Sequence, residues 1–277
     1  MSASFFRRLA LAAGFAATFT AASQTHAYVV DGSISDWGLQ RTGSLSDWTP
    51  LPGVKAWGVE DQTGSPSVFL NPGYGGQRYD AEALYLDWDA SYLYILVVTG
   101  LPSNNLHNPA ANSYGAGDIL IDFGRDGSFD YGLVVKDYAG LTPGAVVRTE
   151  SLHYGIWSAP GVAGTPSPYP VAVASGTTVG TAQLAYSTTG VNNLGQYASD
   201  VHYAIEAAIP LAAFGSDWGV NGPNKAFDVQ WTMYCANDLI TVDPAPASVP
   251  EPDTLVLLGL AALSVLVPLR RHRRRVR

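Results

Sequence analysis

Four aspartates recur at every fourth position of one short stretch: Asp118, Asp122, Asp126 and Asp130. Carboxylate oxygens are the ligands that Ca²⁺ prefers, and a turn at Gly127 would bring these side chains toward one another. The stretch is not an EF-hand loop, because the twelfth position counted from Asp122 is Leu133 instead of a bidentate Glu. We therefore expect a candidate Ca²⁺ site here. The alternative is turn formation at Asp126-Gly127, with Asp118 and Asp122 facing solvent.

The tryptophans are candidates for carbohydrate binding, namely Trp37, Trp48, Trp57, Trp88, Trp157 and Trp218. Sugar rings stack their C–H faces on aromatic side chains, and Trp48 and Trp157 stand in loop-like sequence close to prolines, where we expect exposed rings. Most of the other tryptophans are expected to pack in the core or at turns, and Trp231 belongs to an alternating apolar pattern that predicts burial.

The chain carries no motif typical of an enzyme. It lacks Gly-x-Ser-x-Gly, His-Glu-x-x-His, a phosphate-binding glycine loop and paired cysteines. His107, His153 and His202 lie far apart without metal-ligand spacing, so we interpret each as structural. A glycoside hydrolase or lyase would need only two close carboxylates, and it stays open as an alternative to a non-catalytic protein.

The composition and turn spacing predict an all-β fold. Fifteen Tyr, seven Trp and many Val, Thr and Gly favour strands broken by turns. We expect one hairpin from residues 83–88 and 92–99, and another from 117–123 and 129–135, with Ile119, Ile121 and Phe123 on one face. Further strands are expected at 145–149, 178–185, 201–208 and 228–233, and one helical turn at 209–214. This pattern predicts an antiparallel β-sandwich, jelly-roll-like. The single cysteine, Cys235, is expected to be buried.

Both ends of the chain have the composition of export signals. Residues 1–27 contain Arg7 and Arg8, an apolar stretch and a small-x-small end, as in a signal peptide. Residues 254–269 are apolar and precede six arginines; as a helix they would rise about 24 Å, a short transmembrane anchor with its basic end in the cytoplasm. Between them, residues 28–252 hold seven Lys+Arg and 22 Asp+Glu, a net charge of −15. Such a body repels nucleic acid.

The tail resembles a known sorting signal. Val249, Pro250, Glu251 and Pro252 precede the apolar segment, and Arg270, Arg271, Arg273, Arg274 and Arg275 follow it. This arrangement is similar to the PEP-CTERM signal of Gram-negative bacteria, which is also filed as an ice-binding protein C-terminal domain. The resemblance implies recognition and cleavage by an exosortase, production alongside exopolysaccharide, and delivery to the cell surface or matrix.

The central region resembles family 9-type carbohydrate-binding modules and DOMON-like domains. The segments that carry this resemblance are Asp31 to Trp37, the hairpin from Tyr85 to Thr99, and Tyr203 to Leu211. The resemblance implies a β-sandwich that binds sugar or haem, often with structural calcium. Because Met233 is the one methionine of the mature body, haem lacks its usual axial ligands.

The sequence therefore predicts an exported, non-catalytic β-sandwich that binds carbohydrate or Ca²⁺. The expected parts are a signal peptide (1–27), the sandwich (28–243), a Pro-rich linker (244–253), a transmembrane helix (254–269) and a cytoplasmic tail (270–277). The expected partners are signal peptidase and exosortase during export, the inner membrane in transit, and exopolysaccharide afterwards. A purely structural matrix protein is the remaining alternative.

Overall fold

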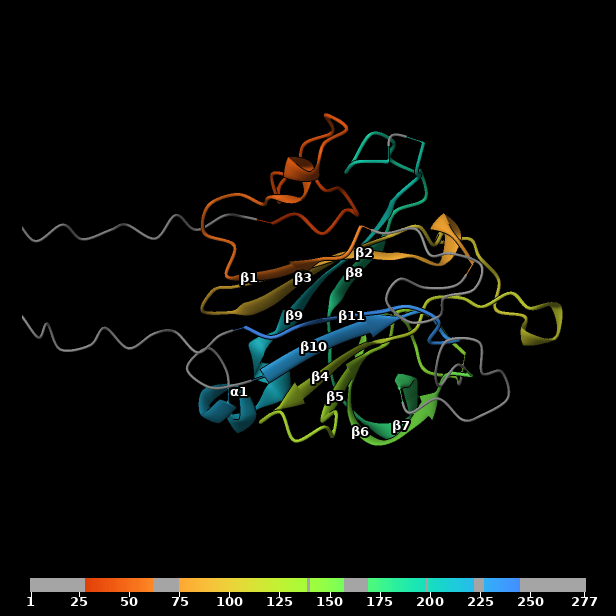
Figure 1. The fold of residues 1–277 in the computed structure, drawn as a ribbon. Coiled ribbons are helices and arrows are strands. Elements are labelled where there is room, and N and C mark those ends of the chain that lie inside the picture. Colours follow the sequence, from red (N-terminus) through yellow and green to blue (C-terminus); the bar gives the residue numbers. More distant parts are fainter. Residues whose placement is uncertain are drawn as a thin grey trace, which may run out of the picture.

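Two antiparallel sheets form the framework of the described chain (Figure 1). The computed structural model describes residues 28–61, 75–138, 140–156, 169–197, 199–221 and 227–244. The five-stranded sheet has the order β1 (Ala56–Val59), β2 (Ala81–Trp88), β3 (Tyr92–Thr99), β9 (Tyr203–Pro210) and β8 (Gln183–Tyr186). The six-stranded sheet has the order β11 (Leu239–Val242), β10 (Phe227–Thr232), β4 (Ile119–Phe123), β5 (Tyr131–Leu133), β6 (Ala145–Tyr154) and β7 (Pro170–Thr181). The predicted all-β class is confirmed.

The helices of the described residues are short. Four are 3₁₀ turns: η1 (Leu45–Trp48), η2 (Gln77–Tyr79), η3 (Pro109–Ala111) and η4 (Leu211–Phe214). The predicted helical turn at 209–214 is η4, which starts after Pro210. The sequence did not predict α1 (Ser216–Asn221), which follows η4 directly. Among the described helices, none is long and apolar enough to cross a membrane.

One hydrophobic cluster joins the two sheets. Leu84 and Leu86 of β2 belong to it together with the inward-facing residues of β4. The predicted alternation is confirmed, since Ile119, Ile121 and Phe123 lie in this cluster whereas Leu120 packs in another. Each fully buried Leu or Ile contributes about 1.5–3 kcal/mol, so this cluster is the main source of cohesion. Cys235 is buried in it, as predicted.

The N-terminal arm, residues 28–61, packs on the outer face of the five-stranded sheet (Figure 1, red to orange). Its apolar side chains form a second cluster with alternate residues of β2, β3 and β9, such as Tyr85 and Val98. Glu206 of β9 fixes the start of the arm: its carboxylate accepts hydrogen bonds from the indole of Trp37 at 2.9 Å and from the backbone N–H groups of Asp31 and Gly32, both at 3.0 Å. The residues from Asp31 to Trp37 therefore serve docking of the arm.

The observed strands differ from the predicted ones mainly in length. β6 and β7 form a long hairpin in which β7 begins at Pro170. The prediction of one strand at 178–185 is wrong, because the chain leaves β7 after Thr181 and enters β8 of the other sheet at Gln183. The sequence did not predict β1 or β11, which have four residues each. Both pair along one side only, with β2 and β10 respectively. Short edge strands carry little periodic signal, which explains their omission.

Several predicted features lie outside the described residues. They are the signal peptide (1–27), Trp157, the linker beyond Pro244, the transmembrane helix (254–269) and the tail (270–277).

Candidate metal centre

Three ionisable side chains from distant parts of the chain meet at one end of the five-stranded sheet. Asp61 ends the arm, Glu82 lies in β2, and His202 directly precedes β9. They are 2 %, 1 % and 1 % exposed. Each offers one ligand atom, and these three atoms lie within 4.8 Å of one another. Among the described residues, this is the one group of three or more such side chains that meets this distance.

Several polar atoms of this group lack a hydrogen-bond partner. Glu82 Oε1 accepts from Gln77 Nε2 at 2.6 Å and lies 3.2 Å from His202 Nε2, although the latter contact lacks hydrogen-bond geometry. The second oxygen of Glu82, Oδ1 of Asp61 and both ring nitrogens of His202 are buried without a partner in the described structure. A buried polar group without a partner costs about 1–3 kcal/mol. A bound cation would satisfy the carboxylate oxygens and one ring nitrogen together.

Asp61 is held in an unusual backbone conformation. Its φ of +38° lies in the left-handed region, which non-glycine residues seldom adopt. Oδ2 accepts from the indole N–H of Trp48 at 2.7 Å and from the backbone N–H of Gln196 at 3.2 Å. The Trp48 ring also packs edge-on against His202, at 5.4 Å between centroids. The Asp61 carboxylate is thus held in place by two donors to Oδ2, while Oδ1 has no hydrogen-bond partner in the described structure.

More carboxyl groups surround the three residues. Burial and the charges of Asp238 and Glu82 raise the pKa of Glu60 to about 8. Burial, the charge of Glu82 and a hydrogen bond with Asp238 raise the pKa of Asp80 to about 11. Within the described parts of the chain, no lysine or arginine forms an ion pair with Glu60, Asp61 or Asp80. This concentration of acidic groups favours a cation.

The ligand types distinguish between metals. Ca²⁺ is bound by oxygen atoms alone in most proteins, whereas Zn²⁺ accepts imidazole nitrogen and carboxylate oxygen at about 2.0–2.2 Å. Ligand atoms that share one such ion lie about 3–4 Å apart, so small side-chain rotations would bring the three atoms to a common ion. Because all three side chains are almost fully buried, the centre is suited to a structural ion that no substrate reaches.

The aspartates of the predicted calcium site act as acceptors for backbone N–H groups. Asp118 bonds Val135 N and Val173 N, and Asp122 bonds the N–H groups of Asp126 and Gly127. Asp126 and Asp130 accept from Ser128 N and Phe123 N. The expectation that Asp118 and Asp122 face solvent under the turn alternative is wrong, since each is 3 % exposed. Calcium binding by this hairpin stays a prediction.

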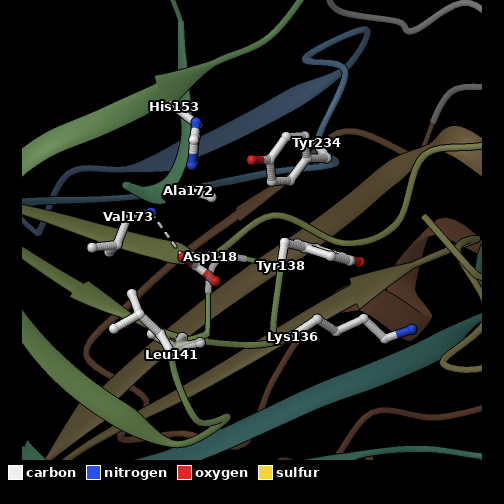
Figure 2. Close-up of a pocket in the computed structure, with 9 residues that line it drawn as sticks. Asp118, Lys136, Tyr138, Leu141, His153, Ala172, Val173 and Tyr234 are labelled. Carbon is white, nitrogen blue, oxygen red and sulfur yellow. Dashed lines mark hydrogen bonds between the residues drawn. The ribbon is translucent and has the colours of Figure 1, made fainter. Parts of the chain in front are cut away.

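Asp118 also lines a small pocket on the outer side of the six-stranded sheet. Figure 2 shows its carboxylate between His153 and Tyr234 on one side and Lys136 and Leu141 on the other. Burial raises the pKa of Asp118 to about 7, although its two backbone hydrogen bonds oppose the shift. The cavity has a volume of about 10 Å³, room for about one water molecule. A sugar ring does not fit into it.

The tryptophans are arranged differently from the prediction. Trp48 is 2 % exposed, so the expectation of an exposed ring there is wrong: the arm folds back and buries the indole beside Asp61. Trp157 lies outside the described residues. Trp57 on β1 is instead 45 % exposed, and its ring stacks on Tyr85 at 6.2 Å and 17°. Of the tryptophans in the described ranges, Trp57 is the one with the exposed ring.

The metal centre was not anticipated from the sequence. Asp61 and Glu82 were not singled out, and His202 was interpreted as structural because the three residues have no regular spacing. One signal was present: Glu82 stands in the apolar run that forms β2, and a carboxylate buried in a strand requires a partner.

Neither a family model nor a curated protein matches the chain. Its function must be inferred from its own residues and their geometry.

Proposed function

We propose that this chain is an exported surface or matrix protein whose two sheets form a jelly-roll-like β-sandwich that holds a structural divalent metal ion. The ligands are Asp61, Glu82 and His202. The observation that carries the proposal is that each of these buried side chains offers a ligand atom within 4.8 Å of the other two, and that each has at least one polar atom without a hydrogen-bond partner in the described structure. The histidine nitrogen favours zinc or a similar transition ion over Ca²⁺.

Metal analysis of the purified full-length chain tests this proposal. After incubation with excess Zn²⁺ and removal of unbound metal, we expect about one tightly held ion per chain. Glu82→Gln and His202→Gln should each reduce this content strongly, because each removes one of three protein ligands. Glu150→Gln is the matched control, since Glu150 is exposed on β6. Equal zinc content in all four proteins, or none in the wild type, would refute the proposal.

Calcium provides the comparison. If the protein retains Ca²⁺ but not Zn²⁺, its site consists of oxygen ligands alone. The aspartates of the β4–β5 hairpin would then be the candidate ligands. We therefore propose to measure both ions on the same preparations, with Asp122→Asn as the hairpin variant.

A second candidate function is carbohydrate binding on the outer face of the five-stranded sheet, with exopolysaccharide as the ligand class. The observation that favours it is the exposed ring of Trp57, supported from below by Tyr85. Trp57→Ala should weaken polysaccharide binding by about 1–3 kcal/mol, while Trp57→Phe should retain part of the affinity. Added salt should change the affinity little, because stacking does not depend on charge pairing. Absence of binding to any polysaccharide of the producing cell would favour a purely structural role.

The glycoside hydrolase or lyase alternative has less support. Asp80 and Asp238 form a carboxyl pair, but they are 2 % and 0 % exposed. A glycosidic bond does not reach a pair that is sealed from solvent.

Export itself is proposed from the two ends of the chain. Signal peptidase would remove residues 1–27, and an exosortase would recognise Pro250, Glu251 and Pro252 ahead of the apolar segment. The inner membrane would hold the protein only in transit, before its release to the cell surface or matrix.

A further inference from the structure

We propose that the metal centre locks the N-terminal arm onto the five-stranded sheet, so that the arm is docked in the metal-loaded protein and released in the metal-free protein. This inference rests on the proposed metal site and assigns it a role. The ion would be shared by the last described residue of the arm, Asp61, and by two residues of the sheet region, Glu82 and His202.

The arm is attached to the sheet by β1, by buried apolar side chains and by polar contacts at its start and its end. Its regular structure consists of η1 and the four-residue edge strand β1. Apart from β1, it packs through a small set of apolar side chains, Ile34, Trp37, Leu39 and Trp48, against the outer face of the sheet. Docking at its start depends on Glu206, which is hydrogen-bonded to Trp37. Its end is held by the backbone N–H groups of Glu60 and Asp61, which both donate to the carbonyl of Glu82, and by the contacts of the Asp61 carboxylate.

The contacts around Asp61 connect several segments. Trp48 from η1 donates its indole N–H to Asp61, and the hydroxyl of Tyr85 on β2 donates to the carbonyl of Trp48 at 2.8 Å. Gln196, from the loop between β8 and β9, donates its backbone N–H to the same carboxylate. In Figure 1 this loop (teal) rises beside the arm. Loss of the Asp61 anchor would therefore loosen both η1 and this loop.

Electrostatics decide whether this anchor holds. Asp61 and Glu82 are both carboxyl groups whose ligand atoms lie within 4.8 Å of each other, and two carboxylates at this distance repel one another. A divalent ion coordinated by both carboxylates replaces this repulsion with attraction. It also occupies the free oxygens of Asp61 and Glu82 and a nitrogen of His202.

Hydrogen exchange on the full-length chain tests the lock, with zinc or with a chelator. The reporters are the N–H of Gly43, which donates to Asn193 in the β8–β9 loop, and the N–H of Leu51, which donates to Trp37. We expect chelation to accelerate exchange of peptides covering 40–61 by at least about tenfold, while peptides covering β4 remain protected. Protection of β4 shows that the sheets stay folded, so the result does not depend on any variant.

Variants of the proposed ligands test whether the effect of zinc on the arm requires the metal centre. Glu82→Gln and His202→Gln should make arm exchange indifferent to zinc, whereas Glu150→Gln should retain the wild-type response. If zinc binds but the hydrogen exchange of the arm is the same with and without zinc, the proposal that the metal holds the arm is wrong, while the proposed metal binding is retained. If no zinc binds and the arm stays docked, the proposed metal function itself fails.

Discussion

At the scale of single residues, Glu82 connects the candidate metal centre to its acidic surroundings. One of its oxygens contacts Gln77 and His202, while its charge contributes to the raised pKa values of Glu60 and Asp80. A carboxylate at this position in a strand costs free energy unless a cation or donors compensate it. The amide of Gln77 compensates only one oxygen. The second oxygen of Glu82 has no hydrogen-bond partner among the described residues, and this unsatisfied oxygen is the reason to propose a bound ion.

Replacement of Trp48 by Phe should reveal how much its indole N–H contributes. The variant keeps an aromatic ring next to His202 but removes the donor to Asp61. Loss of a buried hydrogen bond to a carboxylate should lower the free energy of unfolding by about 1–3 kcal/mol. Urea unfolding measures this change, and Trp57→Phe on the exposed edge should cost less than about 0.5 kcal/mol. Equal costs in the two variants would contradict the role given to the indole N–H.

Asp118 should make stability depend on pH. Burial raises its pKa in the folded protein to about 7, above the value of about 3.9 expected in the unfolded chain. The folded state therefore holds this proton more tightly, and the free energy of unfolding should fall as the pH rises from about 4 to about 7. One such group contributes a slope of up to about 1.4 kcal/mol per pH unit.

Urea unfolding between pH 4 and pH 8 tests this prediction. Asp118→Asn should have a shallower slope, because its side chain does not titrate. Some slope should remain, since burial also raises the pKa of Glu206 to about 7. An unchanged slope in the variant would mean that Asp118 is ionised in the folded protein throughout this range.

At the scale of elements, the hairpins could be predicted from the sequence, whereas the short edge strands β1 and β11 could not. The β2–β3 turn has local chemistry that sequence reveals, because Asp89 accepts from the N–H groups of Ser91 and Tyr92. β1 alternates between half-buried and exposed residues, but its exposed positions are the large apolar Trp57 and Val59 and its half-buried ones the small Ala56 and Gly58, so its sequence does not mark a buried face. The metal centre was unpredictable for a different reason. Its ligands meet only after β2, the arm and the start of β9 have taken their places, and no local spacing encodes that meeting.

The β4–β5 turn gives a prediction at this scale. Asp122 accepts from two backbone N–H groups of the turn, and an Asn side chain has only one oxygen to offer them. Asp122→Asn should therefore lower the free energy of unfolding by about 1–2 kcal/mol. If Asp122 also binds Ca²⁺, millimolar Ca²⁺ should raise the melting temperature of the wild type by several degrees and that of the variant much less. A melting curve that is indifferent to both Ca²⁺ and EDTA would leave Asp122 with its turn role alone.

At the scale of the whole molecule, the excess of acidic residues and the metal centre are related. The chain between the two terminal segments carries a net charge of −15, and several of its carboxyl groups are buried. Self-repulsion of this kind lowers stability. A divalent ion that binds only the folded state adds about 2.7 kcal/mol at a hundred times its dissociation constant. If the protein is exported as proposed, metal availability outside the cell would then influence its stability.

The tail gives the last prediction, which concerns the fate of the whole protein. Residues 254–269 would rise about 24 Å as a helix, somewhat less than the ~30 Å hydrocarbon core, so they would form a marginal anchor stabilised by the arginines that follow. The sequence Pro250-Glu251-Pro252 resembles a processing site just outside that anchor. Glu251→Ala should therefore leave export intact and trap the protein in the inner membrane. Fractionation and immunoblotting of the producing cell measure this, with Glu150→Gln as a control that should reach the surface normally. If Glu251→Ala reaches the surface in wild-type yield, sorting through this motif is wrong.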